Sequence, residues 1–241
     1  MSAAARTLVL VPGAWHGAWC WQRLTPLLQS AGHRVLTPEL AGTGADATDP
    51  AAVTLEGWAR QLAALLRAED QPVLLVGHSR GGAVISRVAE LAAERIRHLV
   101  YVAAYLLPSG GSVAAEARAD EDSVIPANMI AAASGITCTL RPEIIPQAFY
   151  GDCDADTVAL AQESITPEPL KPLVTALRVS EANFGAVPRA YVECTRDRTI
   201  SLAAQRRMQA ALPCDPVLTL ESDHSPFLSH PRELAEWLGR L

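Results

Sequence analysis

The run GHSRG at residues 77–81 has the residue types and the spacing of a catalytic serine turn. Its serine, Ser79, would sit on a strained bend between a strand and a helix, where Cβ atoms two positions before and after it would clash with neighbouring chain. Gly77 and Gly81 remove that clash. The first N–H groups of the following helix, at the positive end of its dipole, would face the place where an oxyanion forms. The motif therefore predicts that Ser79 is a nucleophile.

The sequence on both sides of this turn supplies the strand and the helix that such an elbow needs. The apolar run Val73–Val76 is short and typical of a strand buried on both faces. After the turn, apolar residues recur at three- and four-residue spacing, as in an amphipathic helix: Ala83, Val84, Val88 and Leu91. A bare GxSxG also arises by chance in Gly-rich turns, but the flanking strand and helix favour the elbow.

A serine nucleophile needs a base and an acid, and two later loops offer them. Asp197 follows a predicted strand at 190–194, and His224 follows a predicted strand at 217–220. Both loops would open at the carboxyl ends of their strands, on the side where the elbow opens. His224 would take the serine proton, while Asp197 holds the imidazole in the right tautomer. Asp223, next to the histidine, remains an alternative acid.

Negative charge that develops on a substrate oxygen requires two N–H donors. We expect one from the backbone of Arg80, the residue after the nucleophile, and the other from the turn after the first core strand, where Ala14 is preferred. His16 is expected to order this turn through a hydrogen bond, and His78 to line the floor of the site. Together with Gly13, these two histidines are the candidate substrate-binding residues, and neither is expected to replace the triad histidine.

Buried strands and amphipathic helices alternate along most of the chain. This favours the α/β class, with a mostly parallel sheet of about six strands and helices on both faces. The pattern stops after residue 104, where prolines and short apolar patches show no sustained period. We therefore expect a core of residues 1–104 and 187–241 and a cap (lid) insertion of residues 105–186. Strands are predicted at 7–11, 35–38, 73–76, 99–102, 190–194 and 217–220, and helices from Trp19 or Cys20 to Ala31, from Thr54 to Ala68, after the elbow, at 201–212 and at 231–241.

The overall composition limits the partners and the location. A net charge of −6 without a basic run argues against nucleic acid, and no segment is long enough to cross a membrane. Met1–Arg6, before the first apolar run, is too short for a signal peptide. Five scattered cysteines are typical of reduced thiols, so we expect a cytoplasmic protein, and a homodimer is one option. Neither metal-ligand spacing nor GxGxxG occurs, so no metal and no cofactor are expected.

Four stretches of the chain resemble the methyl esterase and hydroxynitrile lyase branch of the α/β-hydrolase superfamily. They are residues 9–21, 77–82, 194–198 and 222–226, which lie toward both ends of the chain and leave the insertion out. The resemblance implies the α/β-hydrolase fold and a triad of Ser79, His224 and Asp197. It also implies that Ala14 and Arg80 donate their N–H groups, and that esters are cleaved, with cyanohydrin cleavage in some members.

The departures from this pattern favour ester hydrolysis. Lyase members have a threonine at the position of Gly13 and a lysine at the position of Ser225, and the only lysine of this chain, Lys171, lies in the insertion. The cation that would stabilise cyanide is therefore absent from its usual position. Pro12 replaces a histidine common at the start of the turn. Arg80 stands where an apolar residue is more common; its side chain is expected to pair with a nearby carboxylate or to steer an anionic substrate.

The sequence thus predicts a cofactor-free serine hydrolase that cleaves a small to medium, largely apolar carboxylic ester through an acyl-enzyme. The same triad could serve a hydroxynitrile lyase or a thioesterase, and a slow-turnover ligand receptor is a third option, because fold alone does not decide function. The substrate itself stays open. Apolar residues of the insertion that could line a pocket are Val124, Ile125, Met129, Ile130, Ile144, Phe149 and Leu170.

Overall fold

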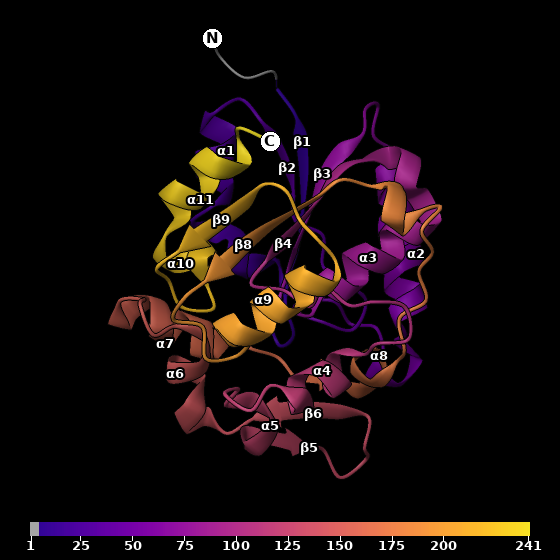
Figure 1. The fold of residues 1–241 in the computed structure, drawn as a ribbon. Helices are drawn as coiled ribbons and strands as arrows, with labels where there is room; N and C mark the ends of the chain where they lie inside the picture. The colour runs from indigo at the N-terminus through magenta and orange to yellow at the C-terminus, as the bar shows by residue number, and fades with distance from the viewer. Residues whose placement is uncertain (1–4) are drawn as a thin grey trace.

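The computed structural model describes residues 5–241, and one parallel sheet forms its centre (Figure 1). Residues 1–4, which belong to the N-terminal segment where no signal peptide is expected, lie outside the described residues. Six strands are hydrogen-bonded in the order β2-β1-β3-β4-β8-β9, and every neighbouring pair is parallel. This confirms the predicted six-stranded α/β sheet. The strands are β1 (Thr7–Val11), β2 (Arg34–Leu36), β3 (Val73–His78), β4 (Ile96–Val102), β8 (Arg189–Cys194) and β9 (Val217–Leu220).

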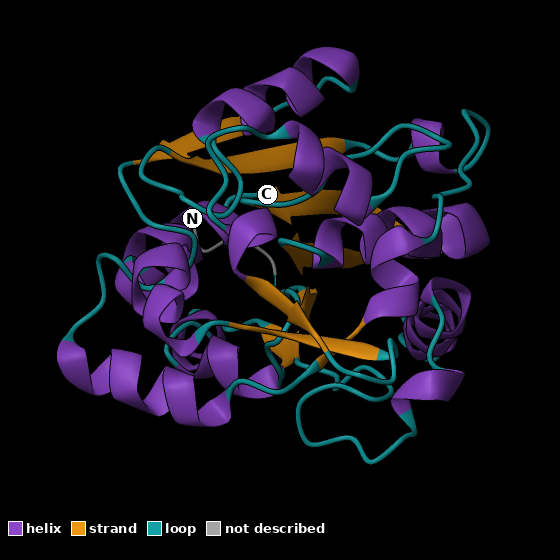
Figure 2. Ribbon diagram, turned by 90° about the horizontal axis from the view of Figure 1, so that it is seen from below, coloured by secondary structure: helices purple, strands orange, loops and turns teal. Residues whose placement is uncertain are grey.

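Helices cover this sheet because its central strands are apolar along their length. All six residues of β3 are buried, which requires cover on both faces, and Figure 2 shows helices on both sides of the strands. As predicted, Thr54 begins the longest helix, where its Oγ1 accepts a hydrogen bond from the Gly57 N–H. The helices around the sheet are α1 (Thr25–Ser30), α2 (Leu55–Arg67), α3 (Gly81–Ala92), α9 (Leu202–Ala211), α10 (Pro226–Ser229) and α11 (Pro231–Leu238), with 3₁₀ turns η2 (Pro50–Ala52) and η3 (Ala93–Arg95).

The first helix differs from the one predicted. Instead of one continuous helix ending at Ala31, the chain forms a 3₁₀ turn, η1 (Ala18–Gln22), and then the short helix α1. Pro26 explains the break, because proline has no N–H and its ring clashes with the carbonyl four residues earlier, so it is tolerated only in the first turn. The segment still packs on the core, where its fully buried apolar side chains include Trp21, Leu24 and Leu28.

Residues 105–186, called the insertion below, connect β4 to β8. Most of them lie at the lower end of the molecule in Figure 1, and the last part before β8 runs back up beside α3. They contain a small antiparallel sheet in the order β5-β6-β7 and several short helices. Their elements are too short to give the sequence a period, which is why none could be predicted. They are α4 (Val113–Ala119), α5 (Ile125–Asn128), β5 (Met129–Ala131), β6 (Thr137–Leu140), η4 (Pro142–Ile144), α6 (Ile145–Phe149), α7 (Ala155–Ser164), β7 (Glu168–Pro169), α8 (Leu170–Val174) and η5 (Phe184–Ala186).

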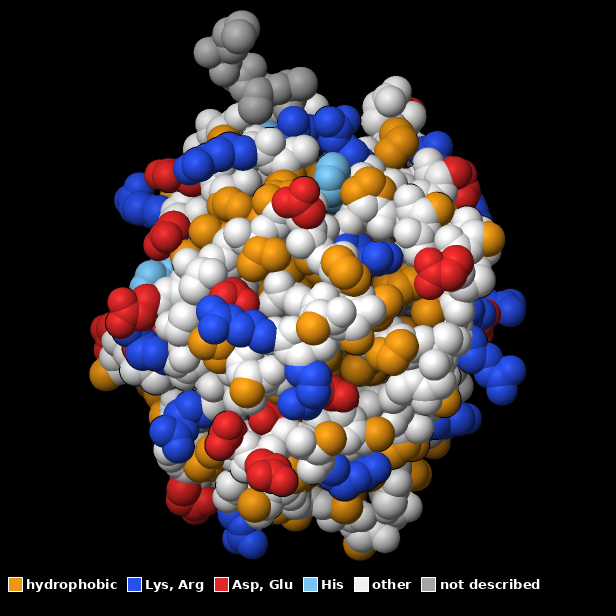
Figure 3. All heavy atoms as spheres, viewed as in Figure 1, with side chains coloured by type: hydrophobic (Ala, Val, Ile, Leu, Met, Phe, Trp, Pro, Cys, Tyr) orange, Lys and Arg blue, Asp and Glu red, His pale blue; other side chains and the backbone are white. Residues whose placement is uncertain are grey.

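The surface carries both signs of charge. On the face seen in Figure 3, acidic and basic side chains alternate without a large area of one sign. Within residues 5–241, no helix combines the length and the apolar character needed to cross a membrane.

Candidate active site

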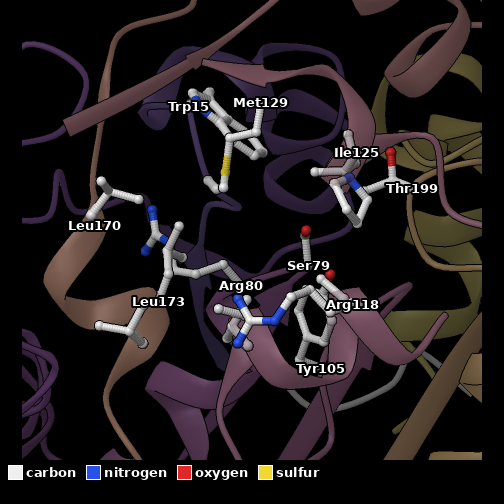
Figure 4. A pocket seen from close by; sticks show the side chains of 16 residues that line it. Trp15, Ser79, Arg80, Tyr105, Arg118, Ile125, Met129, Leu170, Leu173 and Thr199 are labelled. Atoms are coloured by element: carbon white, nitrogen blue, oxygen red, sulfur yellow. The ribbon is translucent and has the colours of Figure 1, made fainter. Parts of the chain in front are cut away.

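The turn between β3 and α3 has the shape that the GxSxG motif predicts. Ser79 adopts a φ of 52°, in the left-handed region that L residues rarely occupy. A Cβ atom on Gly77 would lie 2.7 Å from the Gly81 carbonyl oxygen, and one on Gly81 would lie 2.8 Å from the Val11 carbonyl oxygen. Both glycines are therefore needed for the chain to turn this sharply. The Ser79 hydroxyl points into a cavity at the carboxyl end of β3 (Figure 4).

The loops after β8 and β9 bring an acid and a histidine together. Nδ1 of His224 lies 2.7 Å from Oδ2 of Asp197, and both side chains are buried. The other carboxylate oxygen of Asp197 accepts backbone N–H bonds from Thr199 and Ile200, which fix its orientation. Because a carboxylate only accepts hydrogen bonds, Nδ1 carries the proton in this contact, which leaves Nε2 as the ring nitrogen that can accept a proton.

His224 lies beside the elbow, but its ring is not hydrogen-bonded to the serine. Nε2 of His78 lies 2.9 Å from the His224 carbonyl oxygen, and the two rings are 4.5 Å apart between centroids. Within residues 5–241, Nε2 of His224 has no hydrogen-bond partner and the Ser79 hydroxyl makes no hydrogen bond. Catalytic hydrogen bonds of this kind often form only when substrate is bound.

The alternative acid, Asp223, is directed elsewhere. Its carboxylate accepts hydrogen bonds from the backbone N–H groups of Asp152 and Ser225 and from the Ser229 hydroxyl. These bonds tie the loop after β9 to the insertion and to α10. The acid that contacts the imidazole of His224 is Asp197, as the sequence favoured.

The turn after β1 packs directly against the elbow. A Cβ atom on Gly13 would lie 2.7 Å from Nδ1 of His78 and 2.9 Å from Cβ of Ser79, so only glycine fits there. Ala14 and Arg80 line the same cavity as the serine. Among the described residues, neither of their backbone N–H groups donates a hydrogen bond. Two unpaired donors beside a nucleophile are what an oxyanion hole requires.

The candidate substrate-binding residues Gly13, His16 and His78 are buried behind this turn and are not among the residues that line the cavity. His16 orders the turn, as expected: its Nδ1 lies 2.8 Å from the Ala14 carbonyl oxygen, and its Nε2 lies 2.7 Å from the Tyr150 hydroxyl. Burial is the main cause that lowers the pKa of His16 from 6.5 to about 4. Burial also holds the pKa of His78 well below its usual value. Both rings are therefore neutral near pH 7.

The low pKa of His16 predicts a pH-dependent stability. As pH falls, the His16 ring is protonated near pH 6.5 in the unfolded chain but only near pH 4 in the folded chain. The contribution of His16 to the free energy of unfolding is therefore complete above pH 6.5 and is lost progressively as the pH falls toward 4. The difference in pKa corresponds to about 3 kcal/mol of unfolding free energy. In urea unfolding, the stability advantage of the wild type over His16→Gln should shrink by up to that amount between pH 7.5 and pH 4.5. An advantage that stays constant over this pH range would contradict the low pKa of His16 in the folded chain.

The cavity over Ser79 has a volume of about 90 Å³ and a largely apolar wall. The core contributes Ala14 and Trp15, and the insertion supplies most of the remaining wall (Figure 4). Sequence reasoning missed Trp15 and Tyr105, since neither position showed a pattern that separates lining from packing. The apolar insertion residues that line the cavity are Val113, Ala114, Ala117, Ile125, Pro126, Met129, Leu170, Leu173 and Val174. Of the candidates named from the sequence, Val124, Ile130, Ile144 and Phe149 lie elsewhere.

The Arg80 side chain pairs with a carboxylate, one of the two roles expected for it. Its partner is Glu168 of β7, and both side chains are almost completely buried. Glu168 was not identified from the sequence. The signals that could have pointed to it are weak: a buried cation needs a buried anion, and Glu168 lies between two prolines.

Comparison with known proteins identifies the family of the chain. Residues 8–237 match the sequence model of the family described as "Alpha/beta hydrolase family". The chain is 30% identical to Methylesterase 2 of Arabidopsis thaliana, over 95% of this chain and 93% of the relative. It is 30% identical to Esterase PIR7B of Oryza sativa subsp. japonica, over 100% and 97%. The crystal structure of the methylesterase MES16 from Arabidopsis superposes with a TM-score of 0.85 at 27% identity, with 98% of each chain covered.

Some relatives are longer than this chain. It spans 62% and 56% of the length of two Arabidopsis thaliana relatives, numbered methylesterase 11 and 13, to which it is 31% and 29% identical. The family match nevertheless covers the sheet, the elbow and both loops that follow β8 and β9. On this match and on the relatives that align over almost their full length, the chain belongs to the alpha/beta hydrolase family, in its methylesterase-like branch.

Proposed function

We propose that this chain is a carboxylic ester hydrolase with Ser79 as nucleophile, His224 as base and Asp197 as the acid that orients it. The observation that carries the proposal is the state of His224, whose Nδ1 is bound to Asp197 and whose Nε2 is unpaired beside the elbow. A neutral imidazole with a free lone pair on Nε2 is a ready general base. The names of the relatives, which are esterases and methylesterases, support the same reaction.

The reaction would proceed through an acyl-enzyme. Nε2 of His224 accepts the hydroxyl proton while Oγ of Ser79 bonds to the ester carbonyl carbon, and the N–H groups of Ala14 and Arg80 stabilise the oxyanion. The intermediate then expels the alcohol, which takes the proton from Nε2. In the second half, a water molecule gives a proton to His224 and attacks the acyl carbon. Ser79 regains its proton as the carboxylic acid leaves.

The wall of the cavity supports a small to medium substrate with a largely apolar acyl part. Methyl esters are the first class to test, because the relatives carry that name. In this proposal the insertion, residues 105–186, acts as a cap over the core formed by residues 1–104 and 187–241. A cytoplasmic location and a homodimer remain predictions.

A lyase reaction on a cyanohydrin is less well supported. Ser225 follows His224 in place of a lysine, and Lys171 on α8 is not among the residues that line the cavity. No lysine therefore stands next to the triad histidine or at the wall, and the cations at the wall are Arg80, which is paired with Glu168, and Arg118 of α4. Thioester hydrolysis would use the same triad and the same steps, so it differs from ester hydrolysis only in the substrate that fits.

Labelling with a fluorophosphonate that carries an alkyl chain tests the nucleophile and the reaction together. We expect one covalent adduct per chain, on Ser79, because an activated hydroxyl under an oxyanion hole attacks the phosphorus. Peptide mass spectrometry locates the adduct. In parallel, the unlabelled protein should release methanol from methyl esters of apolar acids, and the labelled protein should not.

Urea-unfolded protein is the control for this labelling, and it should remain unmodified because the reactivity depends on the folded site. Modification of another residue with Ser79 intact would contradict the assignment of the nucleophile. Cyanide release from cyanohydrins without hydrolysis of any methyl, aryl or thioester would favour the lyase. Labelling at Ser79 with no turnover of any substrate would favour a receptor.

A further inference from the structure

Arg80 has a side chain that reaches the turn that holds Ala14. Its Nη2 donates a hydrogen bond of 2.9 Å to the Gly13 carbonyl oxygen. Its Nε lies 3.0 Å from Oε1 of Glu168, an ionic contact rather than an aligned hydrogen bond. The guanidinium also lies 4.4 Å from the ring centroid of Trp58. Figure 4 places Arg80 on the side of the cavity lined by Leu170, two residues after Glu168.

The bond to Gly13 bears on the oxyanion hole because of peptide geometry. The Gly13 carbonyl and the Ala14 N–H belong to the same planar, trans peptide unit, so they point in opposite directions. A donor that fixes the carbonyl also fixes the direction of the N–H. Arg80 therefore acts at two points of the hole: its own backbone N–H is one donor, and its side chain sets the orientation of the other.

Glu168 holds the next peptide unit in the same way. Its Oε2 accepts a hydrogen bond of 3.0 Å from the Trp15 N–H, and the Ala14 carbonyl of that unit is bound by His16. The two peptide units on either side of the Ala14 Cα are thus both fixed by the Arg80–Glu168 pair. One member of the pair comes from the elbow and the other from the insertion.

This turn needs outside support, because its backbone is strained. Trp15 has a φ of 64°, a conformation that is costly for a bulky L residue. The insertion supplies several of the bonds that hold it: the Trp15 indole N–H donates to the Cys138 carbonyl, and the Thr166 N–H donates to the Trp15 carbonyl. Without such bonds, the chain would relax and the Ala14 N–H would turn away.

We propose that Arg80 and Glu168 are positioning residues that hold the Ala14 N–H toward the oxyanion, so that the insertion contributes to catalysis as well as to the wall of the cavity. This inference rests on the proposed ester hydrolysis. An alternative is that the pair only stabilises the fold. The two roles can be separated, because removing both charges of a buried pair together spares the fold, whereas removing one leaves an uncompensated buried charge.

The decisive variant is Arg80→Met/Glu168→Met. It keeps the buried volume and leaves no lone charge, so the protein should still fold, with a melting temperature lowered by a few degrees because the buried Trp15 N–H loses its acceptor. It removes the Arg80 bond to the Gly13 carbonyl, which then keeps only the longer bond of 3.4 Å from the His16 N–H, and it removes the acceptor of the Trp15 N–H. We therefore expect kcat to fall by about tenfold to a hundredfold, below the loss measured when a whole oxyanion donor is removed. KM should change by less than about threefold, and the affinity for a boronic acid that mimics the tetrahedral intermediate should fall in parallel with kcat/KM.

Arg80→Lys approaches the same question with the charge balance retained. Lysine keeps a cation opposite Glu168 but lacks the planar fork that reaches the Gly13 carbonyl at the same time, so kcat should again fall. The matched control is Arg87→Met/Glu56→Met, an ion pair between α3 and α2 that does not line the cavity. Its kcat and its boronic acid affinity should equal those of the wild type.

The outcomes separate this inference from the proposed function. If the wild type hydrolyses esters and either folded variant at position 80 retains the wild-type kcat and boronic acid affinity, the pair is structural and the inference fails alone. If the double variant does not fold, Arg80→Lys decides. If the wild type hydrolyses no ester, or if it does so without Ser79, the proposed function itself fails.

Discussion

In a Ser79→Ala variant, kcat for ester hydrolysis is expected to fall by about 10⁶-fold, the loss seen when a serine nucleophile that acts together with its histidine is removed. The reason is that no other group at the cavity can form the acyl-enzyme. Among the described residues that line it, Thr199 donates its hydroxyl to the Ala148 carbonyl, and burial raises the pKa of Tyr105, so that its phenol stays protonated. Initial rates with a methyl ester, measured as acid release, check this directly.

The fold of this variant should be unchanged. The Ser79 hydroxyl makes no hydrogen bond among residues 5–241, so its loss should change the unfolding free energy by about 0.5 kcal/mol or less. Ser86→Ala is the matched control: it removes a buried hydroxyl on α3, the helix that follows the elbow, where Ser86 is bonded to Tyr101, and it should keep the wild-type kcat with a lower melting temperature. Wild-type turnover in Ser79→Ala would end the acyl-enzyme mechanism.

The elbow could be predicted because the residues that define it are close together in the sequence. Gly77 and Gly81 each stand two residues from Ser79 in sequence; a Cβ at 77 would clash with the backbone of the turn itself, and one at 81 with the carbonyl groups of Val11 and Pro12 at the end of β1. The order of Asp197 and His224 after two strands was also predictable, because parallel strands end at the same edge of the sheet. What the sequence could not show is that Nε2 of His224 stays unpaired in the folded chain.

The contribution of the insertion could not be predicted, for physical reasons that Glu168 illustrates. The sequence indicates that Arg80 needs a carboxylate, but its partner lies 88 positions away on a strand of two residues. Elements this short have no hydrophobic period, so neither their existence nor the direction of their side chains can be inferred from the sequence. For the same reason Phe149, expected as an apolar candidate for the pocket, proves to pack in the core beside His224.

The two histidines behind the turn that holds Ala14 show a second limit of prediction from the sequence. His16 and His78 have the chemistry to bind a substrate, and sequence alone cannot tell a ring in the wall of a cavity from a ring one layer behind it. In the fold, Ala14 and Trp15 form the wall, and both histidines are buried behind them. Their polar atoms serve the backbone instead, at the Ala14 and His224 carbonyl oxygens.

Replacing Asp197 with asparagine should lower kcat by about 10⁴-fold while preserving the geometry of the site. The asparagine oxygen can keep the bonds from the Thr199 and Ile200 N–H groups, which leaves the amide NH₂ facing Nδ1 of His224. Nδ1 must then accept a hydrogen bond, so the ring proton moves to Nε2. In that tautomer the imidazole cannot take the proton of Ser79. Steady-state kcat for the same methyl ester measures the loss.

Asp223→Asn is the matched control, because it changes the neighbouring buried acid in the same way. Asp223 binds the loop after β9 through Ser225, Ser229 and the Asp152 N–H and makes no contact with the imidazole nitrogens. This variant should melt at a lower temperature but keep kcat within about threefold. A loss of kcat as large as that of Asp197→Asn would mean that the acid of the triad had been misassigned. A large loss of kcat in Asp197→Asn alone would mean that the Asp197 carboxylate fixes the tautomer of His224, and that the stability of the loop does not account for the loss.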